Sequence, residues 1–360
     1  MGLGLPELNI YFKNAAETAV KRSGEGIVAL ILRDTTAISA LSSPSAAYGK
    51  LADVSKSHYT TDNYDYISKT FLGSPKKVLV EIIGADENYE AALGRLKNKK
   101  WNYLSVPGIG TDDIAAVAEW IITQREAKKT FKAVLNYDKA DSIAIINFAT
   151  EGIVVGDKTY TAAEYCCRIA GLIAGLSFND YERASATYAT LSEVEAITES
   201  TDPDKDIGAG KLILVNDGSV IKIGRAVNSL QTVEENLTED MKKIRIVEIM
   251  DLMSDDIKEA FASNYLGVYA NSYDYKLLFV NEVTQYFKRL ADSDILEREY
   301  DNTAFIDVDG QRKWLAERSD VSDLSDDEIK KAKTGSLVFV GANVLPLDAM
   351  EDLNMYITSN

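Results

Sequence analysis

The strongest constraint on the fold is the alternation of short apolar runs with longer amphipathic segments in the first half of the chain. Short apolar runs predict strands, and segments whose apolar side chains recur three and four residues apart predict helices. The predicted strands are 27–32, 77–83, 101–106, 131–135 and 143–148, and the predicted helices are 86–97, 111–126 and 161–176. Strands that alternate with helices favour an α/β layer around a largely parallel or mixed sheet.

The second half of the chain has a different pattern and indicates a second domain. The acidic, proline-containing segment 193–206 has almost no large apolar side chains, which is typical of a linker. After it, an Asn-Asp-Gly-Ser turn at 216–219 separates two apolar runs and predicts a hairpin. The predicted hairpin strands are 211–215 and 220–223, the predicted helices are 239–262, 273–291 and 326–333, and a further strand is predicted at 336–340. The predicted fold class is α/β with α+β, in two domains, as the length of 360 residues also suggests.

Composition limits the partners and the location of the protein. Hydrophobic residues make up 46% of the chain and charged residues 26%, which is typical of a soluble globular protein. The net charge of −17 disfavours binding to nucleic acids or to anionic lipids. No apolar run has the length of a membrane span, and Pro6, Glu7 and Lys13 interrupt the stretch where a signal peptide would be apolar. Pro6 also occupies the position at which N-myristoylation requires serine or threonine. We expect a protein that is made and kept in a cytoplasm.

The residue types that most often carry catalysis are scarce. His58 is the only histidine and lies in a polar stretch, which argues against a histidine-dependent triad or general base. Cys166 and Cys167 are adjacent, so they rarely reach disulfide geometry, and they form neither a CxxC nor a zinc pattern. Because they fall within a helical periodicity, we expect them to be buried or half-buried structural thiols.

A glycine-containing loop resembles a dinucleotide-binding motif only in part. Gly108 and Gly110 follow a predicted strand and precede a helix for which Thr111 is the expected N-cap. The third glycine position holds Asp113, and Asp112 lies beside it. Two carboxylates at a helix N-terminus occupy the field that a pyrophosphate needs, so we interpret this loop as a turn.

Acidic clusters are likewise incomplete as metal sites. Asp202, Asp204 and Asp206 match the first ligand positions of an EF-hand loop, but Ile207 and Ile213 stand where glycine and glutamate are required. The Asp-Val-Asp-Gly sequence at 307–310 is a similar fragment. We therefore predict no metal, no cofactor and no catalytic residues, although carboxylate pairs that folding brings together stay open.

Both ends of the sequence carry a short alternating segment beyond the main elements. The apolar side chains that share a face are Leu8, Ile10 and Phe12 in the first segment and Leu353, Met355 and Ile357 in the last. A strand of this kind can stay disordered, fold back on its own domain, or add to the sheet of another subunit. In the last case backbone hydrogen bonds supply affinity and alternate apolar side chains fill pockets. These six residues are the candidates for inter-subunit strands.

Seven stretches of the chain resemble the tail sheath proteins of contractile phages and phage-derived particles of Gram-positive bacteria. In collinear order they are GLPELNIYFKNAAETAVKRSGEGIVALILRD, NYLSVPG, INFATEGIVVGDKTYTAAEYCCRIAGLIAGL, GKLILVNDGSVIKIGRAVNSL, KIRIVEIMDLMSDDIKEAF, NSYDYKLLF and KTGSLVFVGANVLPLDAMEDLNMYI. None is a diagnostic motif alone, but the ordered set spans nearly the whole chain and is specific.

The resemblance implies a structural protein, and not an enzyme, that forms hexameric rings stacked helically around a tail tube. It implies a tube-facing inner domain, residues 1–20 and 201–360, with both terminal arms, and an outer α/β domain, residues 21–200. The arms 8–13 and 352–358 would complete a sheet on the inner domain of neighbouring subunits. Contraction, started by the baseplate, would drive the tube through an envelope without a cofactor.

The implied partners are further copies of the chain, the tail tube protein, the baseplate and the tail terminator. The implied location is the host cytoplasm during assembly and then the virion tail or a phage tail-like particle. Two alternatives stay open. One is the sheath of another contractile injection system, and the other is an α/β enzyme that uses carboxylates in a deep pocket. The sequence does not distinguish a phage from a bacteriocin-like particle.

Overall fold

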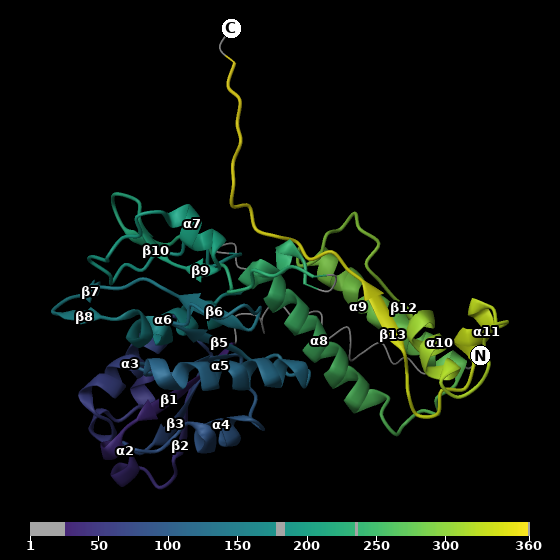
Figure 1. Ribbon diagram of the computed structural model, residues 1–360, viewed down its shortest axis with the longest axis horizontal. Helices are drawn as coiled ribbons and strands as arrows, with labels where there is room; N and C mark the ends of the chain where they lie inside the picture. The colour runs from purple at the N-terminus through teal and green to yellow at the C-terminus, as the bar shows by residue number, and fades with distance from the viewer. Residues whose placement is uncertain (1–25, 178–183, 235–236, 359–360) are drawn as a thin grey trace, which may run out of the picture. The chain divides into compact units, whose positions relative to one another are not determined.

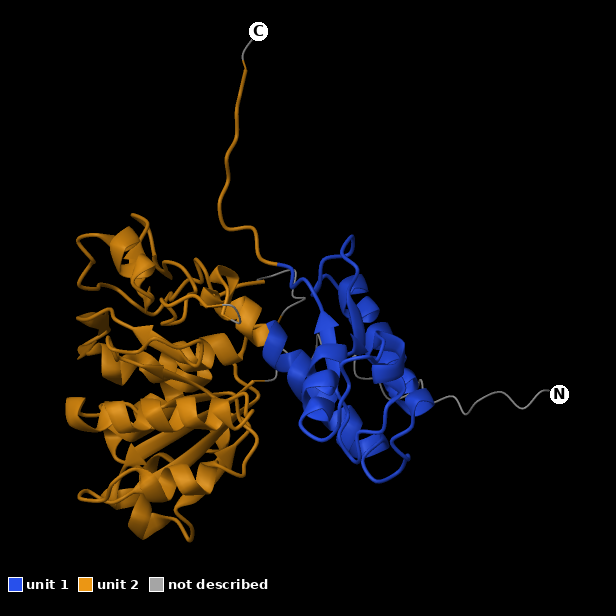
Figure 2. Cartoon of the chain, turned by 45° about the vertical axis from the view of Figure 1, so that its right-hand side comes forward, with its two compact units in different colours: residues 1–20, 249–347 blue, residues 21–248, 348–360 orange. Residues whose placement is uncertain are grey.

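The computed structural model describes residues 26–177, 184–234 and 237–358. The chain divides into two compact units, residues 1–20 with 249–347 and residues 21–248 with 348–360 (Figure 2). Within the described residues, one division falls within helix α8 (Ile244–Asn264) and another after residue 347, so the chain passes between the units at these two places.

A seven-stranded sheet forms the centre of the larger unit (Figure 1). In sheet order the strands are β2 (Ser45–Tyr48), β3 (Lys77–Ile83), β1 (Ile27–Arg33), β4 (Tyr103–Ser105), β5 (Lys132–Leu135), β6 (Ile145–Phe148) and β9 (Lys211–Leu212). All neighbouring strands are parallel except β2, which runs antiparallel to β3 at one edge. The sheet confirms the predicted α/β layer and its mixed character.

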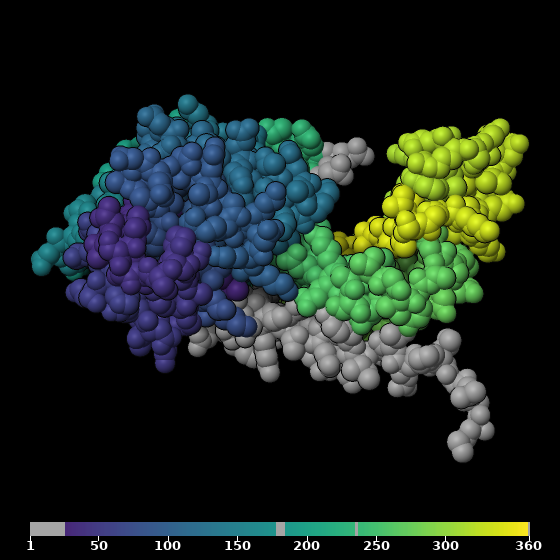
Figure 3. Space-filling view, turned by 90° about the horizontal axis from the view of Figure 1, so that it is seen from below, coloured from purple at the N-terminus to yellow at the C-terminus, as the bar shows by residue number. Residues whose placement is uncertain are grey.

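Helices cover both faces of this sheet, which explains why β1 is apolar up to Arg33 and why β3 is apolar except for Lys77 and the buried Glu81. Helices α3 (Thr61–Phe71) and α6 (Ala162–Ala174) share one core with Val28, Leu30 and Leu32 of β1. Helices α4 (Glu90–Leu96) and α5 (Thr111–Glu126) share the other core with Ala29 and Ile31. The alternation of side chains along one strand thus supplies both cores. The face of the larger unit seen in Figure 3 is closely filled over its described residues.

Helices α3 and α6 approach each other closely because glycines lie at their contact. A Cβ atom added to Gly171 of α6 would lie 2.0 Å from the carbonyl oxygen of Thr70. The N-terminus of α6 is fixed by a capping box, in which Thr161 and Glu164 each accept a hydrogen bond from the backbone N–H of the other. The predicted helix 161–176 is confirmed apart from its last turn.

Short elements complete the larger unit. They are α2 (Thr35–Ala40), the 3₁₀ turns η1 (Leu51–Asp53), η2 (Lys56–His58) and η3 (Glu239–Lys242), the pair β7 (Ile153–Val155) and β8 (Lys158–Tyr160), helix α7 (Pro203–Gly208), and the hairpin β10 (Leu214–Asn216) and β11 (Ile221–Ile223). The hairpin prediction is confirmed, but 211–212 belongs to the large sheet as β9.

The segment 193–206 lies inside the larger unit and does not link the two compact units. Ala196 forms an isolated bridge with Val154, and Glu193 forms an ion pair with Arg168 of α6. The prediction of a linker rested on the acidic, proline-containing composition of this segment. These contacts instead hold the segment against the rest of the larger unit. The division into residues 1–20 with 201–360 and residues 21–200 concerns position in an assembly and stays a prediction.

Among its described residues, the smaller unit contains helices and one two-stranded antiparallel sheet. Its elements are most of α8, then α9 (Tyr273–Asp292), β12 (Thr303–Ile306), α10 (Val308–Ala316), α11 (Asp326–Lys331) and β13 (Val340–Asn343). The strand predicted at 336–340 begins only at Val340. The reason is a turn in which Thr334 Oγ1 donates to the carbonyl of Leu337 and Gly335 has a φ of +62°.

Candidate functional site

The carboxyl ends of the parallel strands are the usual ligand site in open α/β sheets, at the point where the strand order reverses. Here that point lies beside β1, which has β3 on one side and β4 on the other. Arg33, the last residue of β1, donates through Nη1 to the carbonyls of Gly84, Ala85 and Glu87 at 3.0, 2.9 and 2.6 Å. Its Nη2 lies 3.8 Å from Asp113 in the first turn of α5. The guanidinium therefore ties the turn after β3 to the start of α5.

The neighbouring polar residues are also committed to structural bonds. Asp34 is buried and accepts from the backbone N–H groups of Ala37 and Thr60 at 2.8 and 2.9 Å. The N-cap of α5 is Gly110 and not Thr111, and Gly108 has a φ of +68°. The glycines thus serve a tight turn into α5, as predicted for this loop.

The two acidic fragments cap helices. Asp202 accepts from the N–H of Lys205 at the start of α7, and Asp307 accepts from the N–H of Gly310 at the start of α10. Asp206 accepts from Lys211 Nζ at 2.8 Å, and this cation and Ser200 lower the pKa of that carboxyl. Within 26–177, 184–234 and 237–358, no group of three or more His, Cys, Asp or Glu side chains is arranged to hold a metal ion.

His58 and the two cysteines occupy structural positions. His58 ends the 3₁₀ turn η2 and is half-buried. Cys166 and Cys167 are free thiols, both buried against the α3–α6 core. Burial raises the pKa of Cys167 to about 12 and that of Cys166 well above its usual value. The predicted burial of these thiols is confirmed.

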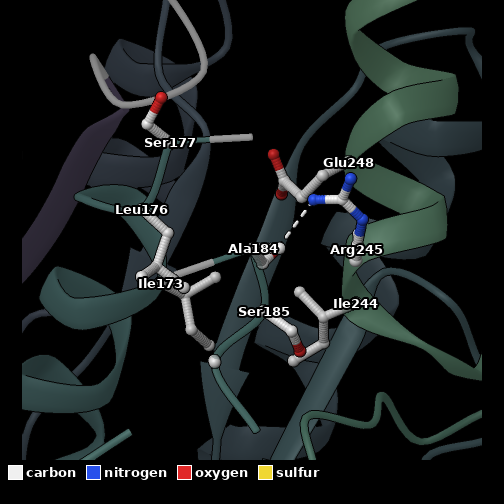
Figure 4. Close-up of a pocket in the computed structure, with 9 residues that line it drawn as sticks. Ile173, Leu176, Ser177, Ala184, Ser185, Ile244, Arg245 and Glu248 are labelled. Carbon is white, nitrogen blue, oxygen red and sulfur yellow. Dashed lines mark hydrogen bonds between the residues drawn. The ribbon is translucent and has the colours of Figure 1, made fainter. Parts of the chain in front are cut away.

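One small cavity lies between the end of α6 and the start of α8 (Figure 4). Ile173, Leu176 and Ile244 supply apolar walls, and Arg245 donates to the carbonyl of Ala184 at 2.7 Å. Its volume of about 20 Å³ has room for a single water molecule, far below the several hundred Å³ of small-molecule sites. In the part of the chain that the structure describes, no helix is long and apolar enough to cross a membrane.

The C-terminal segment exposes the apolar side chains that the sequence singles out. Leu353, Met355 and Ile357 are 86%, 64% and 81% exposed, and the residues around them belong to no helix or strand (Figure 1). Leu8, Ile10 and Phe12 lie outside the described residues. The structure therefore places three of the six candidates on an exposed segment.

Just before this exposed segment lies a set of contacts that the sequence did not predict. Asp348 pairs with Lys243, and Asp352 accepts from Arg225 Nη2 at 2.6 Å. Glu351 accepts from Ser185 Oγ at 3.0 Å. The acidic run at 348–352 was the only available signal, since the cations lie more than a hundred residues earlier and follow no spacing rule.

The sheet of the smaller unit is the second candidate surface for assembly. Strands β12 and β13 pair only with each other among the described residues, from Thr303↔Asn343 to Ile306↔Val340. Phe305 on β12 is 41% exposed. A two-stranded sheet has an outer row of backbone groups on each side, to which further strands can add, although on β12 the N–H of Ala304 donates to Thr284 Oγ1 at 3.0 Å.

Known proteins resemble this chain along nearly its full length. Residues 85–229 match the model of the phage tail sheath protein central domain, and residues 237–359 match the phage tail sheath C-terminal domain. The tail sheath protein of Clostridium phage phiCD119 is 36% identical over 98% of this chain and 99% of its own length.

Solved structures share the fold at low identity. A sheath tail protein from Listeria innocua superposes with a TM-score of 0.67 at 14% identity, over 94% of this chain and 100% of that one. The helical sheath of the anti-feeding prophage in its contracted state has the same TM-score and identity, over 93% and 94%. A sheath tail protein from Desulfitobacterium hafniense has a TM-score of 0.66 at 16% identity, over 79% and 90%.

Proposed function

The chain belongs to the family of phage tail sheath proteins, and from this we propose that it assembles into stacked hexameric rings around a tail tube and contracts to drive the tube through a target envelope. The observation that carries the proposal is the match to a phage tail sheath protein along nearly the whole of both chains. Contacts between different surface patches of neighbouring subunits can build rings and stack them into a helix.

We assign residues 1–20 and 201–360 to the side facing the tube and residues 21–200 to the outer side. The assignment is supported by the position of the two-stranded sheet β12–β13, which lies in the C-terminal part of the chain. The large sheet, whose faces are both covered by helices, lies mostly in residues 21–200. This division is drawn by role in the assembly and differs from the division into compact units.

The proposed linkage between subunits is strand addition. Arms 8–13 and 352–358 of neighbouring subunits would add to the free edges of β12 and β13, with Leu8, Ile10, Phe12, Leu353, Met355 and Ile357 filling apolar positions. Each net hydrogen bond contributes about 0.5–1.5 kcal/mol, so one arm binds weakly and the repeated lattice provides stability.

Contraction needs no cofactor under this proposal, because its free energy is the difference between two packings of the same lattice. The role is structural and not enzymatic. The partners are further copies, the tail tube protein, the baseplate and the tail terminator. Assembly would take place in the host cytoplasm, and the product would be part of a virion tail or of a phage tail-like particle.

The sheath of another contractile injection system is the second candidate. It is favoured by the likeness in fold to the sheath of the anti-feeding prophage. Both candidates would use the same contacts between sheath subunits, so assembly alone does not separate them. The type of particle in which the sheath is found, a phage tail or another injection system, distinguishes the two.

The test is assembly of the full chain, with the tube and baseplate supplied, seen by negative-stain microscopy. We expect rings or tubes from the full chain and none after removal of 1–13 or 352–360, with the far-UV circular dichroism preserved. A sharper variant replaces Leu353, Met355 and Ile357 with Ser. Its matched control replaces the alternate residues Asn354, Tyr356 and Thr358 with Ser. Equal assembly of both triple variants would contradict the proposed strand addition, and a full chain that never assembles would contradict the sheath function.

A further inference from the structure

We propose that residues 348–352 form a releasable clasp that holds the root of the C-terminal arm on the larger unit and lengthens the free arm when it opens. The proposal rests on the proposed sheath function for its purpose, and its contacts are present in the single chain. Arg225 and Lys243 supply the cations that hold the acidic side chains of this segment in place.

The closed clasp is built from three acidic side chains. Asp348 forms an ion pair with Lys243, and Asp352 accepts from Arg225 Nη2 at 2.6 Å. Between them, Glu351 accepts from Ser185 Oγ at 3.0 Å, and its other oxygen lies 3.9 Å from Arg225 Nε. Arg225 thus contacts two successive carboxylates, and the bond to Asp352 is the main cause of its raised pKa.

The last clasp contact is made by Asp352, whose side chain is 77% exposed, and it directly precedes the free chain. The side chain of Glu351 is 6% exposed, whereas Leu353, two residues later, is 86% exposed and Tyr356 is 92% exposed. The apolar positions proposed to enter a neighbouring subunit therefore begin directly after the last clasp contact. A fixed root limits the directions that the arm samples and reduces the entropy lost when it binds.

The same contacts are suited to release. Arg225 and Lys243 keep 33% and 28% of their side-chain surface exposed, so solvent and salt screen their ion pairs. Glu351 Oε2 is buried and accepts no hydrogen bond, and an unsatisfied buried oxygen opposes closure. The clasp is consequently weaker than its number of charges suggests.

Release changes the reach of the arm. With the clasp closed, the six described residues 353–358 lie beyond it and span at most about 20–22 Å when extended. With the clasp open, the eleven residues 348–358 would be free and span at most about 36–40 Å. Subunits that shift against each other by up to about 16–18 Å could stay tethered by the same arm.

The clasp is tested on the unassembled full chain with a spin label at Met350→Cys, a fully exposed position between the contacts. The native thiols Cys166 and Cys167 are buried and leave the label specific. We expect a motionally restricted spectrum that loses its slow component in Arg225→Gln with Lys243→Gln, and also in the parent at 1 M salt. The matched control Lys211→Gln removes a cation of the same 33% exposure and should leave the spectrum unchanged.

A charge exchange provides the rescue. Arg225→Asp with Asp352→Arg should restore the slow component that Arg225→Asp alone removes, and equal melting temperatures show that each variant is folded. A spectrum that does not respond to Arg225→Gln with Lys243→Gln would overturn the clasp, whatever the chain does in assembly.

Release during contraction has a separate readout. A carbodiimide joins the paired side chains of Lys243 and Asp348, and mass spectrometry measures the yield of this cross-link in extended and contracted sheaths. We expect a several-fold lower yield in one of the two states. Equal yields in both would overturn the release, whereas a failure to form any sheath would overturn the proposed function and leave the spin-label result standing.

Discussion

At the scale of single residues, the larger unit depends on a few positions where the backbone of one element meets another. Gly171 of α6 faces the Thr70 carbonyl of α3, and Gly175 faces the carbonyl of Gly73, with 1.9 Å from an added Cβ to that oxygen. No rearrangement of a flexible side chain relieves such a contact, because the opposing atom is backbone. Cys166 and Cys167 lie about one turn earlier in the same helix.

Gly171→Ala should therefore destabilise the larger unit by about 1–3 kcal/mol, the usual range for overpacking. Urea unfolding followed by circular dichroism measures the change. Gly94→Ala is the matched control: Gly94 lies within helix α4, and an added Cβ there meets nothing within 4 Å. It should stabilise by about 0.5–1 kcal/mol, because alanine loses less backbone entropy in a helix. Equal effects of the two variants would contradict the close packing of α3 on α6.

At the scale of elements, the sequence predicted best where the apolar pattern was strong. Strand β3 and helix α5 have the predicted bounds, because both carry long apolar patterns that the core requires. The sequence analysis did not predict strand β2 or helix α3, because neither has such a pattern. Strand β2 has the sequence Ser-Ala-Ala-Tyr, and helix α3 has four buried positions in a polar sequence. Helix α4 starts at Glu90 and not at residue 86, since the turn before it is held by Arg33.

The candidate site was predictable only in part, for a related reason. The alternation at 353–357 singled out three apolar side chains, but all residues from 352 to 358 are exposed, so alternation does not account for their exposure and their role between subunits stays a prediction. The clasp could not be predicted, because it joins residues such as Arg225 and Asp352, which are 127 positions apart. Side chains that meet only through the tertiary fold leave no periodic signal in the sequence.

An acid-sensitive contact holds the segment after Leu191 to helix α6. Arg168 Nε donates to Glu193 Oε1 at 2.6 Å. Burial alone would raise the pKa of Glu193, but the hydrogen bond and charge of Arg168 outweigh it and lower that pKa below its usual 4.5. Because the folded-state pKa is the lower one, the stabilisation is complete above about pH 4.5 and is lost as the pH falls through the folded-state value.

Arg168→Gln should lower the free energy of unfolding by about 1.5–3 kcal/mol at pH 7, the range for hydrogen bonds to charged groups. The difference from the parent should shrink below pH 4.5, as Glu193 becomes protonated in both proteins. Urea unfolding at pH 7 and pH 3.5 measures this. The control Lys50→Gln removes a 72% exposed cation beside Asp53 in the same unit and should change stability by less than about 0.5 kcal/mol at either pH. A loss that is independent of pH would show that Arg168 acts through packing alone.

At the scale of the whole molecule, charge opposes the proposed assembly. The chain has 56 acidic and 39 basic residues, so each copy carries a net charge of −17. Copies in a lattice repel one another over the Debye length, about 30 Å at 0.01 M salt and about 8 Å at 0.15 M. The clasp also keeps Arg225 and Lys243 paired with acidic residues of their own chain, which removes these cations from contacts with neighbours.

The concentration needed for assembly should therefore fall as salt rises from 0.01 to 0.15 M, because screening weakens the repulsion while apolar arm contacts persist. Near 1 M the ion pairs of the clasp are screened as well, so the arms are freed and assembly should become less regular. Pelleting gives the threshold concentration, and negative-stain microscopy gives the order of the tubes. Sodium chloride and potassium acetate at equal ionic strength separate screening from binding of a particular ion. If the threshold instead rises steadily with salt, attraction between unlike charges on neighbouring subunits governs assembly, and the apolar arms are secondary.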